Sequence, residues 1–142
     1  MIVRGTTPYH TFILPIASSS IKEVWVTYLQ NGAIVLNKKN GDSGVTFEEV
    51  NLETENAHVE DYESNEEIVP STQLTVHLTQ EETLAFKFYP AAEKNIAVVQ
   101  IRILDQDDEA YASDPIRERI FGVLKDEVIG NEQNSNSEIG GE

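Results

Sequence analysis

Short runs in which apolar and polar side chains alternate constrain the fold of this chain more than any other feature of its sequence. In residues 96–104, Val99, Ile101 and Ile103 occupy every second position. Successive side chains of a β-strand point to opposite faces, so this spacing predicts a strand with one buried face. Further runs of this kind, rich in β-branched and aromatic residues, are 9–15, 22–29, 33–38, 45–52, 74–78 and 110–112 continued by 115–124. The chain is therefore predicted to be built from strands.

The dipeptide Asn31-Gly32 joins two of these runs, 22–29 and 33–38. Asn-Gly supplies the two positive-φ positions of a type I′ turn, which connects antiparallel neighbours in a two-residue hairpin. We therefore predict that these two strands pair with each other. A cluster of turn-forming residues then precedes 45–52, whose interrupted alternation indicates a β-bulge.

The later part of the chain contains one helical signal and one strong hairpin. Thr79-Gln80-Glu81-Glu82 has the spacing of a capping box, in which Thr and Glu side chains satisfy main-chain groups at the start of a helix, and predicts a single helical turn. Residues 105–109 predict the tip of a hairpin that follows the central strand 96–104. The chain then returns in 110–112 and 115–124 as the final strand, for which a short helix is the alternative.

Seven or eight short strands at turn spacings of about 8 to 12 residues, with at most one short helical turn, are typical of an all-β fold. We predict an antiparallel two-sheet β-sandwich of the Ig-like kind. The length of 142 residues suits one domain. The sandwich domain is expected to span 1–124, and a polar, acidic C-terminal tail follows at 125–142.

Acidic residues are concentrated in two parts of the chain, whose formal net charge is -15 from 25 acidic and 10 basic residues. Residues 48–67 contain no Lys or Arg and these carboxylates: Glu48, Glu49, Glu53, Glu55, Glu60, Asp61, Glu63, Glu66 and Glu67. The tail 125–142 contains one basic residue, Lys125, and five acidic residues: Asp126, Glu127, Glu132, Glu138 and Glu142. Because 53–71 has almost no apolar side chains, it predicts an exposed acidic loop or insertion in the sandwich.

Charge and composition exclude several classes of partner and chemistry. A strongly negative surface repels nucleic-acid phosphates and anionic lipid headgroups, so neither nucleic acid nor a membrane is an expected partner. The chain has no cysteine, which excludes disulfides, thiol nucleophiles and Cys-ligated zinc. Residues 1–5 lack the apolar run of a signal peptide, and no stretch approaches the ~20 apolar residues of a membrane span. We expect a soluble chain made in the cytoplasm.

No residue set points to catalysis, and no cofactor is expected. The spacing of His10, His58 and His77 does not predict that they converge on a metal or a substrate. Ser18-Ser19-Ser20 lacks the Gly-x-Ser-x-Gly turn that exposes a nucleophile, and predicts a loop between strands. The sequence also lacks a phosphate-binding loop and a glycine-rich dinucleotide turn. We therefore predict a non-enzymatic protein without catalytic, cofactor-binding or metal-binding residues.

Two residue groups permit a binding site, each with a structural alternative. The acidic side chains of the predicted hairpin tip offer the oxygen ligands that calcium requires, but without the glycine and the spacing of an EF-hand loop. These side chains are Asp105, Asp107, Asp108 and Glu109. Trp25, Tyr28 and Tyr89 could form a sugar-stacking patch, whereas a single Trp in a small sandwich is more often a core residue.

The acidic stretch 48–67 also has two interpretations. It attracts a basic partner protein by electrostatic steering, with Val59 and Tyr62 as apolar anchors, or it is a solvated loop that keeps the protein soluble. Charge alone does not distinguish these two functions, so both interpretations stay open.

Several segments, taken in order, resemble a known group of proteins. The chain opens with Arg4-Gly5-Thr6-Thr7-Pro8, His10-Thr11-Phe12 and Leu14-Pro15. Later segments with the same strand and turn pattern are Ile21-Lys22-Glu23-Val24, Val26-Thr27-Tyr28, Leu74-Thr75-Val76, Leu78-Thr79-Gln80-Glu81-Glu82-Thr83-Leu84, Val99-Gln100-Ile101-Arg102 and Ala112-Ser113-Asp114. Spanning about 4–128, they resemble short β-sandwich proteins encoded among the structural genes of phages and prophages of gut Gram-positive bacteria. More loosely, the chain resembles the N-terminal domain of phage baseplate upper proteins.

The resemblance implies a structural protein of the phage virion, made in the cytoplasm of a bacterial host and placed in the tail, baseplate or neck. Its partners would be other virion proteins and copies of itself, bound by packing and by strand addition at open sheet edges. Segments 1–8 and 125–142 are the parts expected to lie against partners. The alternatives are a carbohydrate-binding or host-adhesion module and a head-surface decoration protein. The stretch 53–71 and the tail after 130 depart from the compact family pattern.

Overall fold

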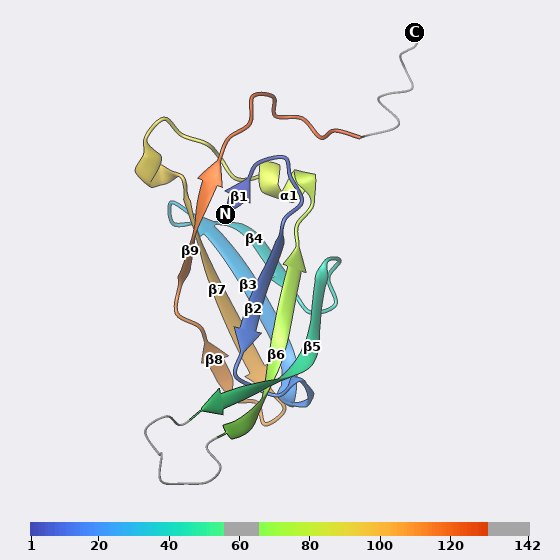
Figure 1. Ribbon diagram of the computed structural model, residues 1–142. Helices are drawn as coiled ribbons and strands as arrows, with labels where there is room; N and C mark the ends of the chain where they lie inside the picture. The colour runs from blue at the N-terminus through green and yellow to red at the C-terminus, as the bar shows by residue number, and fades with distance from the viewer. Residues whose placement is uncertain (56–65, 131–142) are drawn as a thin grey trace.

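Two β-sheets packed against each other make up the computed structural model, which describes residues 1–55 and 66–130 (Figure 1). This confirms the predicted all-β sandwich. The strands are β1 (Ile2–Val3), β2 (Tyr9–Leu14), β3 (Ile21–Gln30), β4 (Ala33–Lys39), β5 (Val45–Glu55), β6 (Glu66–His77), β7 (Ile96–Asp105), β8 (Ala110–Ala112) and β9 (Ile116–Phe121). Within the described ranges, the helical segments are α1 (Gln80–Leu84) and the 3-10 turns η1 (Ser18–Ser20) and η2 (Ala92–Lys94). No helix in these ranges is long and apolar enough to cross a membrane.

The strands are divided between a six-stranded and a three-stranded sheet. The larger sheet has the order β1-β9-β7-β3-β4, with β8 also paired to β7, and the smaller sheet has the order β2-β6-β5. In the described ranges every pairing is antiparallel, as predicted, except that β1 lies parallel to β9. The prediction missed β1 because two residues are too few to show an alternating pattern. The chain crosses from one sheet to the other between β1 and β2 (Figure 1).

A two-residue turn joins β3 and β4, as predicted. Asn31 and Gly32 have φ angles of 52° and 81°. The register pairs Gln30 with Ala33 directly across the turn. Gly and Asn reach positive φ at little cost, which explains why this dipeptide directs the chain into a hairpin.

The helical turn α1 begins with the predicted capping box. Thr79 Oγ1 accepts a hydrogen bond from the Glu82 N–H at 3.1 Å, and Glu82 Oε1 accepts one from the Thr79 N–H at 2.9 Å. The other carboxylate oxygen of Glu82 lies 2.7 Å from Nζ of Lys38, a buried side chain of β4. This carboxylate therefore both caps α1 and holds it to the edge of the larger sheet.

The apolar faces of the two sheets meet in one core. Tyr28 of β3 and Phe86, which follows α1, are fully buried and contact each other edge to face. Alternate residues of the central strands complete the interior: Val24, Val26, Leu74, Val76, Val99, Ile101, Ile103 and Ile120. Burying a Val, Leu or Ile side chain stabilises a fold by roughly 1.5–3 kcal/mol, so the alternating positions are a major source of stability.

Strands occupy both ends of the segment 53–71, which was predicted to be an exposed acidic loop or insertion. Strand β5 continues to Glu55 and β6 begins at Glu66, so the prediction was wrong at both ends of the segment. Main-chain hydrogen bonds between neighbouring strands extend a ladder whatever side chains the strands carry, and an acidic composition does not prevent this. Residues 56–65 lie outside the described part of the chain. They include His58, Val59 and Tyr62.

The final strand is divided in two. Both β8 and β9 pair with β7, and residues 113–115 interrupt them. Ser113 marks the break, because its Oγ accepts the hydrogen bond from the Ile101 N–H at 3.0 Å. The alternative of a short helix at 115–124 is wrong, since Ile116–Phe121 forms β9.

The N-terminal segment belongs to the sandwich itself. Ile2 is fully buried, and β1 extends the larger sheet beyond β9. The Ile2 side chain of segment 1–8 packs into the core of its own chain, and the expected contact of this segment with partners stays a prediction.

The start of the tail is held against the body of the domain. Nη1 of Arg4 lies 2.5 Å from Asp126 Oδ1. Gln80 exchanges two hydrogen bonds with the main chain of Ile129, donating to its oxygen at 2.9 Å and accepting from its N–H at 2.7 Å. Residues 131–142 of the predicted tail lie outside the described residues.

Candidate functional site

The histidines that the structure describes lie on opposite faces of β2 and β6. His10 points inward, with Nδ1 at 2.8 Å from the Tyr28 hydroxyl, and burial lowers its pKa. His77 lies on the outer face, where its ring stacks on Tyr9 with 3.8 Å between centroids. Burial also raises the pKa of Tyr28. The structure does not bring His10 and His77 together, and His58 lies outside the described residues.

The serine cluster is part of the framework that links the two sheets. Ser18 Oγ lies 2.8 Å from Thr72 Oγ1, and the Thr72 hydroxyl donates to the Ile16 oxygen at 2.7 Å. The Ser18 N–H donates to Glu49 Oε1 at 3.2 Å. Ser18–Ser20 forms a 3-10 turn between β2 and β3, in agreement with the predicted connection between strands.

The acidic hairpin tip uses its first carboxylate to build the turn. Asp105 Oδ1 accepts hydrogen bonds from the N–H groups of Asp107 and Glu109, both at 2.9 Å, and Oδ2 accepts one from the Tyr111 hydroxyl at 3.0 Å. These bonds lower the pKa of Asp105. Asp108 instead lies 2.8 Å from a lysine, Lys22. In residues 1–55 and 66–130, no group of three or more His, Asp or Glu side chains is placed to hold a metal ion.

The predicted sugar-stacking patch does not form. Tyr28 is fully buried in the core. Trp25 lies on the outer face of the larger sheet, and Tyr89 follows α1 in a loop, with Lys94 Nζ at 5.6 Å from its ring centre. The alternative of one exposed set of three aromatic rings is therefore excluded, because alternation along β3 turns Trp25 and Tyr28 to opposite faces. The expected core position of the single Trp is also wrong, since Trp25 is half-buried on the outer face.

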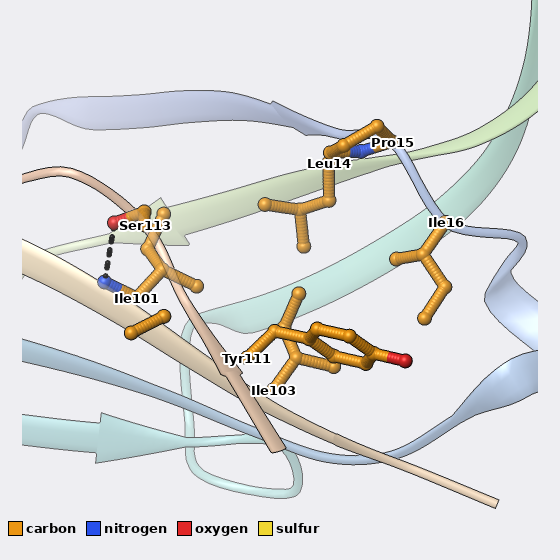
Figure 2. A pocket seen from close by; sticks show the side chains of 8 residues that line it. Leu14, Pro15, Ile16, Ile101, Ile103, Tyr111 and Ser113 are labelled. Atoms are coloured by element: carbon orange, nitrogen blue, oxygen red, sulfur yellow. Dashed lines mark hydrogen bonds between the residues drawn. The ribbon is translucent and has the colours of Figure 1, made fainter. Parts of the chain in front are cut away.

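An apolar groove lies between the two sheets at the side where β2 and β8 face each other (Figure 2). Its volume is about 400 Å³. Leu14 and the isoleucines of β7 lie in its interior, and the Tyr111 ring lies beside them (Figure 2). The complete lining is Leu14, Pro15, Ile16, Ile101, Ile103, Tyr111, Ala112 and Ser113. The groove can accept an apolar group but contains no charged side chain.

The edge of β8 beside the groove is open for hydrogen bonding. The Ser113 N–H donates to the Ile101 oxygen at 2.8 Å, and the Asp105 N–H donates to the Glu109 oxygen at 2.9 Å. Bonded and non-bonded pairs alternate in an antiparallel ladder, so the main-chain groups of Ala110 and Ala112 point away from β7. They face outward from the sheet.

The edge of β2 on the other side of the groove is open in the same way. The Leu78 N–H donates to the Pro8 oxygen at 3.0 Å, which makes Pro8 and Leu78 a bonded pair. By the same alternation, the N–H and C=O groups of Tyr9, Thr11 and Ile13 point away from β6. The side chains of these residues cover the outer face of the sheet, where Tyr9 is 68% and Ile13 48% exposed.

The sequence contained a weak signal for this site. In the run 9–15, both faces carry apolar or aromatic side chains, whereas a strand with one solvated face normally shows polar residues on that face. The excess of apolar residues on β2 is what the structure exposes. The other half of the groove could not be anticipated, because Ile101, Ile103 and Tyr111 come from a distant part of the chain.

No family model matches this chain, and no curated protein and no solved structure is detectably similar to it. The resemblance to phage structural proteins therefore stays a prediction.

Proposed function

We propose that this chain is a non-enzymatic structural protein that binds an extended segment of a neighbouring subunit at the groove between β2 and β8. The observation that carries this proposal is the combination of an apolar groove with an open strand edge on each side. An added strand gains affinity from main-chain hydrogen bonds and specificity from side chains that enter a pocket at alternate positions. Both elements of such a site are present here.

The groove suits a bulky aliphatic or aromatic side chain of the incoming segment. Its lining is almost entirely apolar, and burial of one Leu or Phe side chain contributes roughly 1.5–3 kcal/mol. The exposed rings and methyl groups of Tyr9 and Ile13 add apolar surface on the outer side of β2. An extended segment with apolar residues at every second position is therefore the expected ligand.

We propose that the assembly is a phage virion, with the protein in its tail, baseplate or neck. The partners would be other virion proteins and copies of this chain, and not nucleic acid or membrane lipid. The resemblance of segments within 4–128 to phage structural proteins supports this setting, and the net charge of -15 argues against a phosphate-rich partner.

Thr11→Pro tests the strand-addition site directly. The Thr11 N–H points outward, so proline removes a donor needed by an added strand without removing a hydrogen bond to β6. Displayed random peptides should yield ligands with alternating apolar residues for the wild-type chain. We expect Thr11→Pro to weaken their binding at least about tenfold, measured by calorimetry, because several main-chain bonds form together.

Thr11→Val is the matched control, since it keeps the N–H and the strand conformation. Equal binding by wild type and Thr11→Pro, or the selection of no peptide at all, would contradict the proposal. The virion setting needs its own test: mass spectrometry of purified phage particles induced from a host that encodes this chain should detect it in amounts comparable to other tail proteins.

A further inference from the structure

The two sheets of the sandwich carry opposite charge. Strands of the six-stranded sheet contain Lys22, Lys38, Lys39, Arg102, Arg117 and Arg119 against Glu23, Asp105 and Glu118. Strands of the three-stranded sheet contain no Lys or Arg, and carry Glu48, Glu49, Glu53, Glu55, Glu66 and Glu67. A chain whose total charge is strongly negative thus concentrates positive charge on one sheet.

The positive side chains gather on the outer face of the larger sheet, which we call the basic face and define by Trp25, Lys39, Arg102, Arg117 and Arg119. Arg102 and Lys39 are the direct cross-strand neighbours of Trp25, one on each side. Lys39 Nζ lies 5.5 Å from the Trp25 ring centre. Residues directly opposite in a sheet share a face, so these three side chains form one continuous row.

A second row of cross-strand neighbours, two of them aliphatic and one basic, lies farther along the same face. Leu29 pairs with Val98, and Val98 pairs with Arg117. Arg119 stands opposite Ile96 at the end of the sheet. All four basic side chains of the face are exposed, whereas Lys38 and Glu118 of the same sheet form ion pairs elsewhere, with Glu82 and with the N-terminal amine.

The basic face also has apolar character. Trp25, Leu29 and Val98 are half-buried, and Ile34 on β4 is 66% exposed. A hollow of about 250 Å³ lies beside Glu23, Trp25 and Arg102, and Glu23 Oε1 accepts a hydrogen bond from Trp25 Nε1 at 2.9 Å. An aromatic ring flanked by two cations and hydrogen-bonded to one carboxylate, with aliphatic side chains next to it, is typical of a protein-binding surface rather than a purely solvated one.

We infer that the basic face binds the acidic β5–β6 strand pair (45–55 and 66–77) of a second copy of this chain. From Asn40 to Phe86 the sequence contains no Lys or Arg, so no basic residue of this segment offsets the charge of the Glu residues on the strand pair. The strand pair cannot reach the basic face of its own chain, because the two lie on opposite sheets of the sandwich. Charge complementarity therefore favours a contact between copies.

The contact joins two different surfaces of the same chain. Such a contact is heterologous and continues from copy to copy, which forms a ring or a filament. Whole-molecule repulsion from the net charge of -15 opposes it, but at physiological salt the screening length is only about 8 Å, so charges at the contact dominate. The basic face and the β2–β8 groove share no residue, so a contact at one surface can be tested independently of the other.

A charge-swap experiment tests the inference. The face variant is Lys39→Glu/Arg102→Glu/Arg119→Glu, and the strand-pair variant, on β5 and β6, is Glu48→Lys/Glu53→Lys/Glu67→Lys. At 0.1 M salt, sedimentation velocity of the wild-type chain should show self-association that increases with protein concentration and weakens at 0.5 M salt. Each variant alone should associate at least about tenfold more weakly, because like charges then meet at the contact.

Mixing the two variants in equal amounts should restore association, since each acidic surface again meets a basic one. The control Lys87→Glu/Lys94→Glu/Lys125→Glu changes net charge as much as the face variant but lies outside the basic face, and should associate like wild type. Circular dichroism confirms that each variant is folded. A wild-type chain that stays monomeric, a control that loses association equally, or a mixture that shows no recovery would each overturn the inference.

Discussion

The end of the sandwich that carries α1 and the side between β2 and β8 are built in different ways. At the α1 end, Arg4 donates to the oxygens of Phe86 and Leu84 at 2.6 and 3.1 Å, and Glu82 joins α1 to Lys38. At the groove, main-chain groups of two edge strands point outward over an apolar interior. The difference indicates that polar groups at the α1 end stabilise the fold, whereas those at the groove remain available to another molecule.

Substitution of Arg4 should have the largest effect on stability. Arg4→Ala leaves the buried Phe86 oxygen and the partly buried Leu84 oxygen without their charged donor, and we expect a loss of about 3 kcal/mol in the free energy of unfolding. Urea denaturation measures this value. Asp126→Asn is the control, because its side chain is 53% exposed and little stability should depend on it. Equal losses from both variants would mean that the ion pair, rather than the carbonyl contacts, holds the α1 end.

Variants of Glu82 should have the next largest effect. Glu82→Ala removes the capping box and leaves the buried Lys38 ammonium without its partner, which should cost about 2–3 kcal/mol. Glu82→Gln preserves the reciprocal cap and an acceptor for Lys38, so its thermal midpoint should lie between those of wild type and Glu82→Ala. Identical midpoints for the two variants would show that the carboxylate charge alone is important.

The α1 end should also respond to acid through His10. Burial lowers the pKa of His10 from its ordinary value of 6.5. The hydrogen bond to the Met1 oxygen and the charge of Glu118 act in the opposite direction, and the N-terminal amine acts in the same one. The unfolded chain therefore binds more protons at this site than the folded chain, and the contribution of His10 to stability is lost as the pH falls below 6.5. Above this pH the contribution is complete.

Urea midpoints at about pH 7 and about pH 5.5 test the acid response. The loss of stability between these values should be greater for wild type than for His10→Gln, which does not titrate. Carboxylates titrate in both proteins and cancel in the comparison. A variant that loses as much stability as wild type would show that His10 is not the acid-sensitive group.

The groove side should be the least sensitive to substitution in the isolated protein. Ile13→Thr changes a half-exposed side chain on β2, and should alter the free energy of unfolding by less than about 0.5 kcal/mol. Binding of a selected extended peptide should nevertheless weaken measurably in calorimetry, because apolar contact area is lost. Destabilisation of the isolated protein by Ile13→Thr as large as that by the α1-end variants would contradict the proposed difference between the two regions.

Features that depend on nearby residues were predictable. Asn31 and Gly32 direct the β3–β4 turn through their positive φ angles, and the capping box at the start of α1 forms between residues three positions apart. The alternation in β3 and β7 likewise indicated which side chains share a face of the sheet. The extent of β5 and β6 was not predictable, since their ladder through the acidic segment depends on main-chain pairing.

The sequence by itself therefore determined the β-sandwich class, the main hairpin, the cap of α1 and the concentration of acid between β4 and α1. Only the tertiary structure decided that β1 lies parallel to β9, that β2 and β8 flank an apolar groove, and that Lys39, Arg102 and Trp25 form one row. The physical reason is that local patterns depend on backbone conformation within a few residues. A groove or a surface row depends on which distant strands become neighbours and in what register, and packing of the whole chain selects these.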